Sequence, residues 1–177
     1  MTMSLSDFEI QTSIGRGAFG EVLMAVSKKT RRIYAIKLMN KNFISKKGKS
    51  LSIFREKAIL KFLSHPNILK LEASFMNDDN LCLLMELIEG DDLGTILEEN
   101  KTVDPAFAQM VTREVLNALQ YMHSMGIFHG DVKAQNIMIT KDYKVKLIDF
   151  GCSNYFETND KNSAVVESIE KFKAKLN

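Results

Sequence analysis

The spacing of apolar residues is mainly that of strands up to about residue 88 of this 177-residue chain and mainly that of helices after it, and this change constrains the fold more than any other feature. Five early segments read as strands, and the first three of them alternate apolar and polar side chains as half-buried strands do. They are residues 8–14, 21–26, 32–39, 69–75 and 81–87. A helical pattern over residues 51–63 ends at His65-Pro66-Asn67. The first part of the chain therefore predicts a five-stranded antiparallel sheet with one helix.

The pattern becomes helical after residues 89–92, where acidic residues and a glycine interrupt the apolar segments. Asp104 is a good N-cap, and Pro105 favours the first helical position. Apolar residues at helical spacing continue from there to about Ser124 and predict one long helix. We place a boundary after residue 88 and expect a second unit up to residue 156, followed by a polar tail.

Composition and charge exclude several classes of protein. With 45% hydrophobic and 26% charged residues, the chain has the balance of a globular protein. Basic residues crowd the stretch from Lys28 to Lys61, but such a run is usually a solvated surface, so no nucleic-acid partner is expected. No apolar run approaches the roughly 18 residues of a membrane span, and no signal peptide is visible. Two cysteines form no disulfide framework. We expect a cytoplasmic protein without a transmembrane segment.

Residues 15–20 have the spacing Gly-x-Gly-x-x-Gly, which is weak evidence alone because dinucleotide-binding folds use the same spacing. A dinucleotide site needs a helix after the glycines, whereas residues 21–26 read as a strand. The glycines therefore lie in a hairpin, which can cover a triphosphate with its backbone amides. An exposed lysine on a strand is usually only solubilising, but Lys37 follows this hairpin and could meet the phosphates. Glu56 is the nearby carboxylate that could hold it.

Residues 129–136, His-Gly-Asp-Val-Lys-Ala-Gln-Asn, are the most informative stretch. Asp131 could accept a hydroxyl proton, and the side-chain oxygen of Asn136 could hold Mg²⁺ in the same pocket. Asp149, which begins Asp-Phe-Gly after the next strands, is the natural second metal ligand. Each piece alone could be an ordinary turn. The sequence combines five such pieces: the glycine hairpin, Lys37, Glu56, residues 129–136 and Asp-Phe-Gly. All five in this order and spacing are very improbable by chance.

Together these motifs resemble the eukaryotic protein kinase superfamily from Phe8 to Phe156. The first ninety residues are most similar to the lipid- and cyclic-nucleotide-regulated serine/threonine kinases, with the calcium/calmodulin-type and Aurora-type kinases close behind. The resemblance implies an α+β, two-lobe fold with a five-stranded antiparallel small lobe and one helix. That lobe would span residues 1–88, an incomplete and mainly helical large lobe residues 89–156, and a polar tail residues 157–177.

The same resemblance implies a serine/threonine protein kinase whose partners are ATP, Mg²⁺ and a protein substrate. The catalytic residues would be Lys37, Glu56, Asp131 and Lys133, and the metal ligands Asn136 and Asp149. The nucleotide would contact Gly15, Gly17, Gly20, Val22, Ala35, Lys37, Met85, Glu86, Ile88, Asp92 and Met138. Lysine two positions after the catalytic aspartate is the serine/threonine pattern, and Lys133 would neutralise the γ-phosphate.

Two departures from the family pattern keep alternatives open. Gly130 replaces the arginine that usually precedes the catalytic aspartate, and His-Gly-Asp is similar to the aminoglycoside and choline phosphotransferases. Few residues follow Gly151, and they contain no Ala-Pro-Glu motif or peptide-docking loop. A catalytically silent ATP-binding scaffold and a small-molecule phosphotransferase therefore remain beside the protein kinase. We also expect nucleotide binding to exceed phosphate transfer, and self-association or a partner to cover the exposed face of the 104–124 helix.

Overall fold

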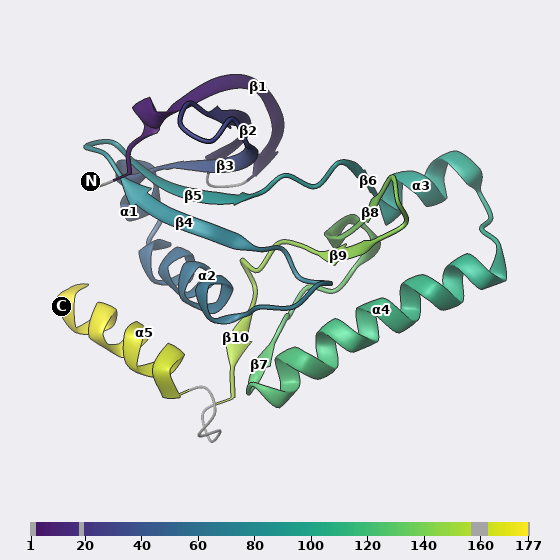
Figure 1. Ribbon diagram of the computed structural model, residues 1–177. Coiled ribbons are helices and arrows are strands. Elements are labelled where there is room, and N and C mark those ends of the chain that lie inside the picture. Colours follow the sequence, from purple (N-terminus) through teal and green to yellow (C-terminus); the bar gives the residue numbers. More distant parts are fainter. Residues whose placement is uncertain (1–2, 18–19, 157–162, 177) are drawn as a thin grey trace. The chain divides into compact units, whose positions relative to one another are not determined.

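The computed structural model describes residues 3–17, 20–156 and 163–176, and the chain forms two compact units. Residues 1–50 and 70–87 make up the first unit, and residues 51–69 and 88–177 the second. Figure 1 shows the sheet of the first unit and the helices and short strands of the second. The predicted lobe boundaries stay a prediction. In the structure, residues 51–69 belong to the second unit although they precede β4 and β5 in the sequence.

The first unit is built on one five-stranded antiparallel sheet, as predicted, with the order β1-β2-β3-β5-β4. Its strands are β1 (Phe8–Gly17), β2 (Gly20–Ser27), β3 (Ile33–Asn40), β4 (Leu71–Met76) and β5 (Asn80–Glu86). A buried apolar cluster on this sheet includes Phe8, Ile36 and Phe75, and the rings of Phe8 and Phe75 stack at 6.0 Å. The four central residues of β5, Cys82 to Met85, are all buried, and they form a continuous apolar run.

A short helix that the sequence analysis did not predict follows β3. Helix α1 (Lys41–Lys46) begins after Asn40, whose side chain accepts a hydrogen bond from the Phe43 amide at 3.0 Å. Asparagine is among the best N-caps, so the signal was present in the sequence. A single-turn 3₁₀ helix, η1 (Leu5–Asp7), precedes β1.

Helix α2 (Ser50–Phe62) matches the predicted helix, and the segment after it is tied to elements far along the chain. The Asn67 side chain donates to the Val145 carbonyl at 3.0 Å, and the Leu147 amide donates to the Asn67 carbonyl at 2.8 Å. The Ser64 amide donates to the Tyr121 hydroxyl at 3.0 Å. Through Ser64 and Asn67, these bonds attach the segment after α2 to elements of the second unit.

The long predicted helix is confirmed as α4 (Pro105–Ser124), with Asp104 as its N-cap and proline in its first turn. The Asp104 carboxylate accepts from the Ala106 amide at 2.6 Å. Val111, Val115, Ala118 and Met122 are buried along one stripe, as their spacing predicts. Within the described residues no helix is long and apolar enough to cross a membrane.

Short strands and helices hold the remaining loops of the second unit. Strands β6 (Gly90–Asp92), β8 (Ile137–Thr140) and β9 (Val145–Leu147) form one sheet, and β7 (Ile127–Phe128) pairs with β10 (Asn154–Tyr155). The helices are α3 (Leu93–Asn100), η2 (Ala134–Asn136) and α5 (Ser163–Leu176). Strands β8 and β9 lie between Asn136 and Asp149, where the sequence analysis expects strands. Residues 90–92, which belong to the segment predicted as the boundary, form strand β6 instead. Gly-Asp-Asp has a weak strand propensity, but pairing with β8 overrides it.

Candidate active site

Adjacent strands of the first unit bring several predicted nucleotide-binding residues together. Val22 and Lys37 are partners across β2 and β3, and Ala35 and Met85 are partners across β3 and β5. Ala35 and Met85 are buried. Glu86, the last residue of β5, pairs with Tyr34. The main-chain register of the sheet therefore sets these positions.

The glycine segment lies in a hairpin, as predicted. Strands β1 and β2 pair from Phe8 to the partners Gly17 and Gly20, and Gly15 is opposite Val22. A Cβ atom on Gly15 would touch only the Val22 side chain at 3.9 Å. A Cβ atom on Gly20 would overlap the main-chain carbonyl of Leu38 in β3. Gly20 is therefore required by the sheet itself, whereas the packing at Gly15 allows a side chain. Residues 18 and 19 lie outside the described part of the chain.

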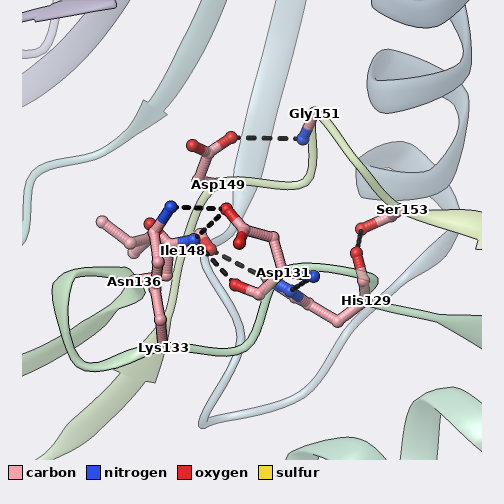
Figure 2. Close-up of polar contacts among 8 residues, drawn as sticks. All are labelled: His129, Asp131, Lys133, Asn136, Ile148, Asp149, Gly151 and Ser153. Carbon is pink, nitrogen blue, oxygen red and sulfur yellow. Dashed lines mark hydrogen bonds and ion pairs between the residues drawn. The ribbon is translucent and has the colours of Figure 1, made fainter.

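Asp131 is the centre of a hydrogen-bonded cluster in the loop between β7 and η2 (Figure 2). One carboxylate oxygen, Oδ2, accepts from Lys133 Nζ at 2.7 Å and from Asn136 Nδ2 at 2.9 Å. Asn136 Nδ2 also donates to the Asp131 carbonyl at 2.8 Å. The hydrogen bond from Lys133 lowers the pKa of Asp131 below its usual value, and the same contact raises the pKa of Lys133. The structure thus brings together three of the predicted residues.

His129 connects this loop to the Asp-Phe-Gly segment. Its ring is buried, and its Nε2–H donates to the Ile148 carbonyl at 3.0 Å. That bond leaves Nδ1 as the acceptor for the Asp131 amide, at 3.3 Å. The ring meets Phe150 edge-to-face at 4.9 Å. Burial is the main reason why the pKa of His129 is lowered, so the neutral ring is favoured.

Asn136 and Asp149 provide oxygen atoms of the kind that Mg²⁺ prefers. Asn136 is buried and is oriented by the two bonds that its Nδ2 donates, which directs its Oδ1 away from Asp131. Asp149 has a left-handed backbone, φ 58°, and its Oδ1 accepts from the Gly151 amide at 3.2 Å. The Ile148 amide donates to the Asn136 carbonyl at 2.9 Å, so the segments that carry these two side chains are joined directly. The residues present fit a magnesium ion.

Asp92 has a local structural role that the sequence analysis missed. It is the N-cap of α3, where its carboxylate accepts from the Thr95 amide at 3.0 Å and from the Thr95 hydroxyl at 2.8 Å. Asp92 is also the partner of Met138 across β6 and β8. The Asp-x-x-Thr spacing carried the capping signal. Ile88 lies in the segment between β5 and β6.

Glu56 and Ser153 are two further buried polar residues. Glu56 is buried on α2, and a buried carboxylate needs a cation or hydrogen-bond donors. Its predicted pairing with Lys37 stays a prediction. Ser153 is buried too, and its hydroxyl donates to the His129 carbonyl at 2.9 Å. No local pattern in the sequence marks Ser153, because its partner lies 24 residues earlier in the chain.

Comparison with known proteins shows which proteins this chain is similar to. The family model described as "Protein kinase domain" matches residues 8–172. The Arabidopsis thaliana protein "3-phosphoinositide-dependent protein kinase 1" is 37% identical over 145 residues, which are 82% of this chain and 30% of that protein. Human "Rho-associated protein kinase 1" is 38% identical over 151 residues, 85% of this chain and 11% of that protein.

A third relative extends the match along the chain. The Arabidopsis thaliana "Serine/threonine-protein kinase AtPK1/AtPK6" is 33% identical over 168 residues, 95% of this chain and 36% of that protein. The chain therefore spans only about a tenth to about a third of the length of these relatives.

Proposed function

Because the chain belongs to the protein kinase family and its relatives include serine/threonine kinases, we propose that it transfers the γ-phosphate of Mg-ATP to Ser or Thr hydroxyls of proteins. The observation that carries the proposal is the cluster of Asp131, Lys133 and Asn136, which one main-chain hydrogen bond joins to the loop of Asp149. A carboxylate base, a cation and two oxygen ligands at this spacing are the parts that phosphoryl transfer needs.

Asp131 would act on the substrate hydroxyl. Its lowered pKa keeps the carboxylate ionised at neutral pH. Both hydrogen bonds from side chains go to Oδ2, which leaves Oδ1 to accept the hydroxyl proton. The substrate oxygen would form the new bond to the γ-phosphorus, the bond from that phosphorus to the β–γ bridging oxygen would break, and the products would be ADP and a phosphoester. Lys133 would donate to an oxygen of the transferring group.

The remaining predicted residues would bind the nucleotide and its metal. Asn136 and Asp149 would hold Mg²⁺, which neutralises charge on the phosphates when it is bound. Lys37 would contact the α- and β-phosphates, with Glu56 holding its ammonium group. The sheet pairs Val22 with Lys37 and Ala35 with Met85, which supports a nucleotide site along these strands.

Lys133 supports serine and threonine as the acceptors. Phosphoamino-acid analysis of a phosphorylated basic protein should show phosphoserine and phosphothreonine, and mostly phosphotyrosine would contradict the proposal.

Gly130 replaces the arginine that usually binds a phosphorylated activation loop. Phosphatase treatment should therefore leave the rate unchanged.

A binding experiment and an activity assay on the same sample test the proposal. Mg-ATP should raise the melting temperature, since a ligand that binds only the folded chain at 100 times its Kd adds about 2.7 kcal/mol. Lys37→Met and Asp149→Asn should each reduce that shift. No shift at millimolar Mg-ATP would overturn the nucleotide site. A shift without turnover on protein would favour a silent scaffold, and turnover only on an aminoglycoside or choline would favour a small-molecule phosphotransferase.

A further inference from the structure

Gly130 lies between His129 and Asp131 in a backbone conformation that only glycine adopts easily. Its φ is 82°, in the left-handed region. A Cβ atom at this position would lie 2.5 Å from the carbonyl oxygen of Cys152 and 3.2 Å from its carbonyl carbon. Both are main-chain atoms, so no rotation of a side chain can relieve the overlap. Any other residue at position 130 must displace one of the two loops.

Two hydrogen bonds of His129, to residues before and after Cys152, hold these two loops together (Figure 2). Before Cys152, the His129 ring donates to the Ile148 carbonyl at 3.0 Å. After Cys152, the Ser153 hydroxyl donates to the His129 carbonyl at 2.9 Å, and β10 pairs with β7. The Cys152 carbonyl is therefore confined between two fixed points. Moving it away from residue 130 would break contacts that orient His129, and through His129 the Asp131 amide.

We propose that Gly130 is a positioning residue that sets the spacing between the catalytic loop of Asp131 and the metal-binding loop of Asp149. The inference rests on the proposed function and extends it to a residue that touches neither substrate nor metal. Its consequence is that arginine, which is usual at this position in the family, should impair this chain. The close approach of the Cys152 carbonyl leaves no room for the Cβ of arginine, whatever its guanidinium group could bind.

Steady-state kinetics on the full chain test the proposal with Gly130→Ala, Gly130→Asn and Gly130→Arg. A displacement of about 1 Å in a catalytic group can lower the rate about a hundredfold. We expect kcat to fall about that much in all three variants, with a much smaller change in KM for ATP. Gly48→Ala is the matched control, since Gly48 also has a positive φ, 62°, but no atom lies within 4 Å of its added Cβ. It should keep the kcat of the wild type.

Asparagine separates backbone strain from overlap, because it tolerates the left-handed conformation but still carries a Cβ. Wild-type kcat in Gly130→Asn would overturn the proposal, since it would show that strain alone caused the loss in Gly130→Ala. Wild-type kcat in Gly130→Ala or Gly130→Arg would overturn it as well.

Hydrogen exchange provides a measurement that does not depend on activity. The amides of Ser153 and Phe156 donate to the Phe150 and Gly126 carbonyls. Peptides covering residues 148–156 should exchange faster in Gly130→Ala and Gly130→Asn, and at the wild-type rate in Gly48→Ala. If the wild type shows no turnover, the proposed function fails, but this exchange result still decides the role of Gly130. Unchanged exchange in both Gly130 variants would overturn the inference.

Discussion

The two units position their predicted functional residues by different means. In the first unit, Val22, Lys37, Ala35 and Met85 are placed by main-chain pairing between neighbouring strands. In the second unit, Asp131 is placed by side chains, through bonds from Lys133 and Asn136 and from its own amide to the His129 ring. Among the described residues, no buried side-chain nitrogen or oxygen lacks a hydrogen-bond partner.

This difference predicts how the two units respond to substitution. A sheet tolerates changes to a functional side chain, because the register that places it belongs to the main chain. A side-chain network does not, since removing one partner leaves another unsatisfied or free to move. Substitutions of the nucleotide-binding residues on the sheet should therefore mainly change nucleotide affinity, and substitutions in the network around Asp131 should mainly change turnover.

The largest expected effect comes from Asp131→Asn, compared with Lys37→Met. Loss of a general base lowers rates about 10²- to 10⁴-fold, so kcat of Asp131→Asn should fall by that factor. Its ATP affinity should stay near the wild-type value, because Asp131 does not contact the nucleotide in the proposed mechanism. Lys37→Met should weaken ATP binding as well. Measuring ATP affinity and kcat for both variants checks the contrast, and equal loss of affinity in both would break it.

A smaller effect, on stability, is expected from the glycine hairpin. Gly20→Ala forces a methyl group onto the Leu38 carbonyl, and overpacking of this kind typically costs about 1–3 kcal/mol. Gly15→Ala is the matched control, because its Cβ would have ordinary contact with Val22 only. Denaturant unfolding should show the loss for Gly20→Ala alone. Equal stability of the two variants would show that β2 and β3 separate easily at this point.

Acid should weaken the second unit through His65 and His129. Burial is the main cause that lowers the pKa of both His65 and His129 below the usual value of about 6.5. A lowered folded pKa means that the unfolded chain binds protons first. The stabilisation is fully present above about pH 6.5 and is lost as the pH falls through the lower folded pKa. Aspartate titrates near 3.9, so the interval from pH 6.5 to 5 reports on histidine.

The variant His65→Asn sharpens this prediction. His65 Nδ1 accepts from the Asn67 amide at 3.1 Å, and its ring stacks on Tyr121 at 5.0 Å. The charge of Glu114 raises the pKa of His65 and that of Lys146 lowers it, both less strongly than burial lowers it. An asparagine oxygen can accept the same amide without titrating. The melting temperature of His65→Asn should fall less between pH 6.5 and 5 than that of the wild type. His123→Gln, on an exposed position of α4, is the control and should keep the wild-type slope. An unchanged slope in His65→Asn would remove His65 from the explanation.

How far the sequence predicted each part depends on whether the signal is local. Five strands, α2 and α4 follow from hydrophobic period and capping, and the match to the kinase family confirms the α+β fold class. The short strands β6, β7 and β10 were not predicted, because pairing with distant segments stabilises two or three residues that have no period of their own. The close approach of Cys152 to Gly130 is likewise tertiary. The sequence showed that glycine stands at position 130, and the structure gives a physical reason for it.

The smallest expected effect concerns the bond between the segment after α2 and α4. Tyr121→Phe keeps the ring that stacks on His65 at 5.0 Å but removes the hydroxyl that accepts from the Ser64 amide. A net hydrogen bond is worth about 0.5–1.5 kcal/mol, and Ser64 is exposed, so water can satisfy its amide and the loss should lie at the low end. Tyr155→Phe is a suitable control, since only its main chain forms described hydrogen bonds. If the Ser64 bond attaches residues 63–69 to the second unit, peptides covering those residues should exchange hydrogen faster in Tyr121→Phe and at the wild-type rate in the control. Unchanged exchange there would show that the Asn67 and Leu147 bonds hold the segment alone.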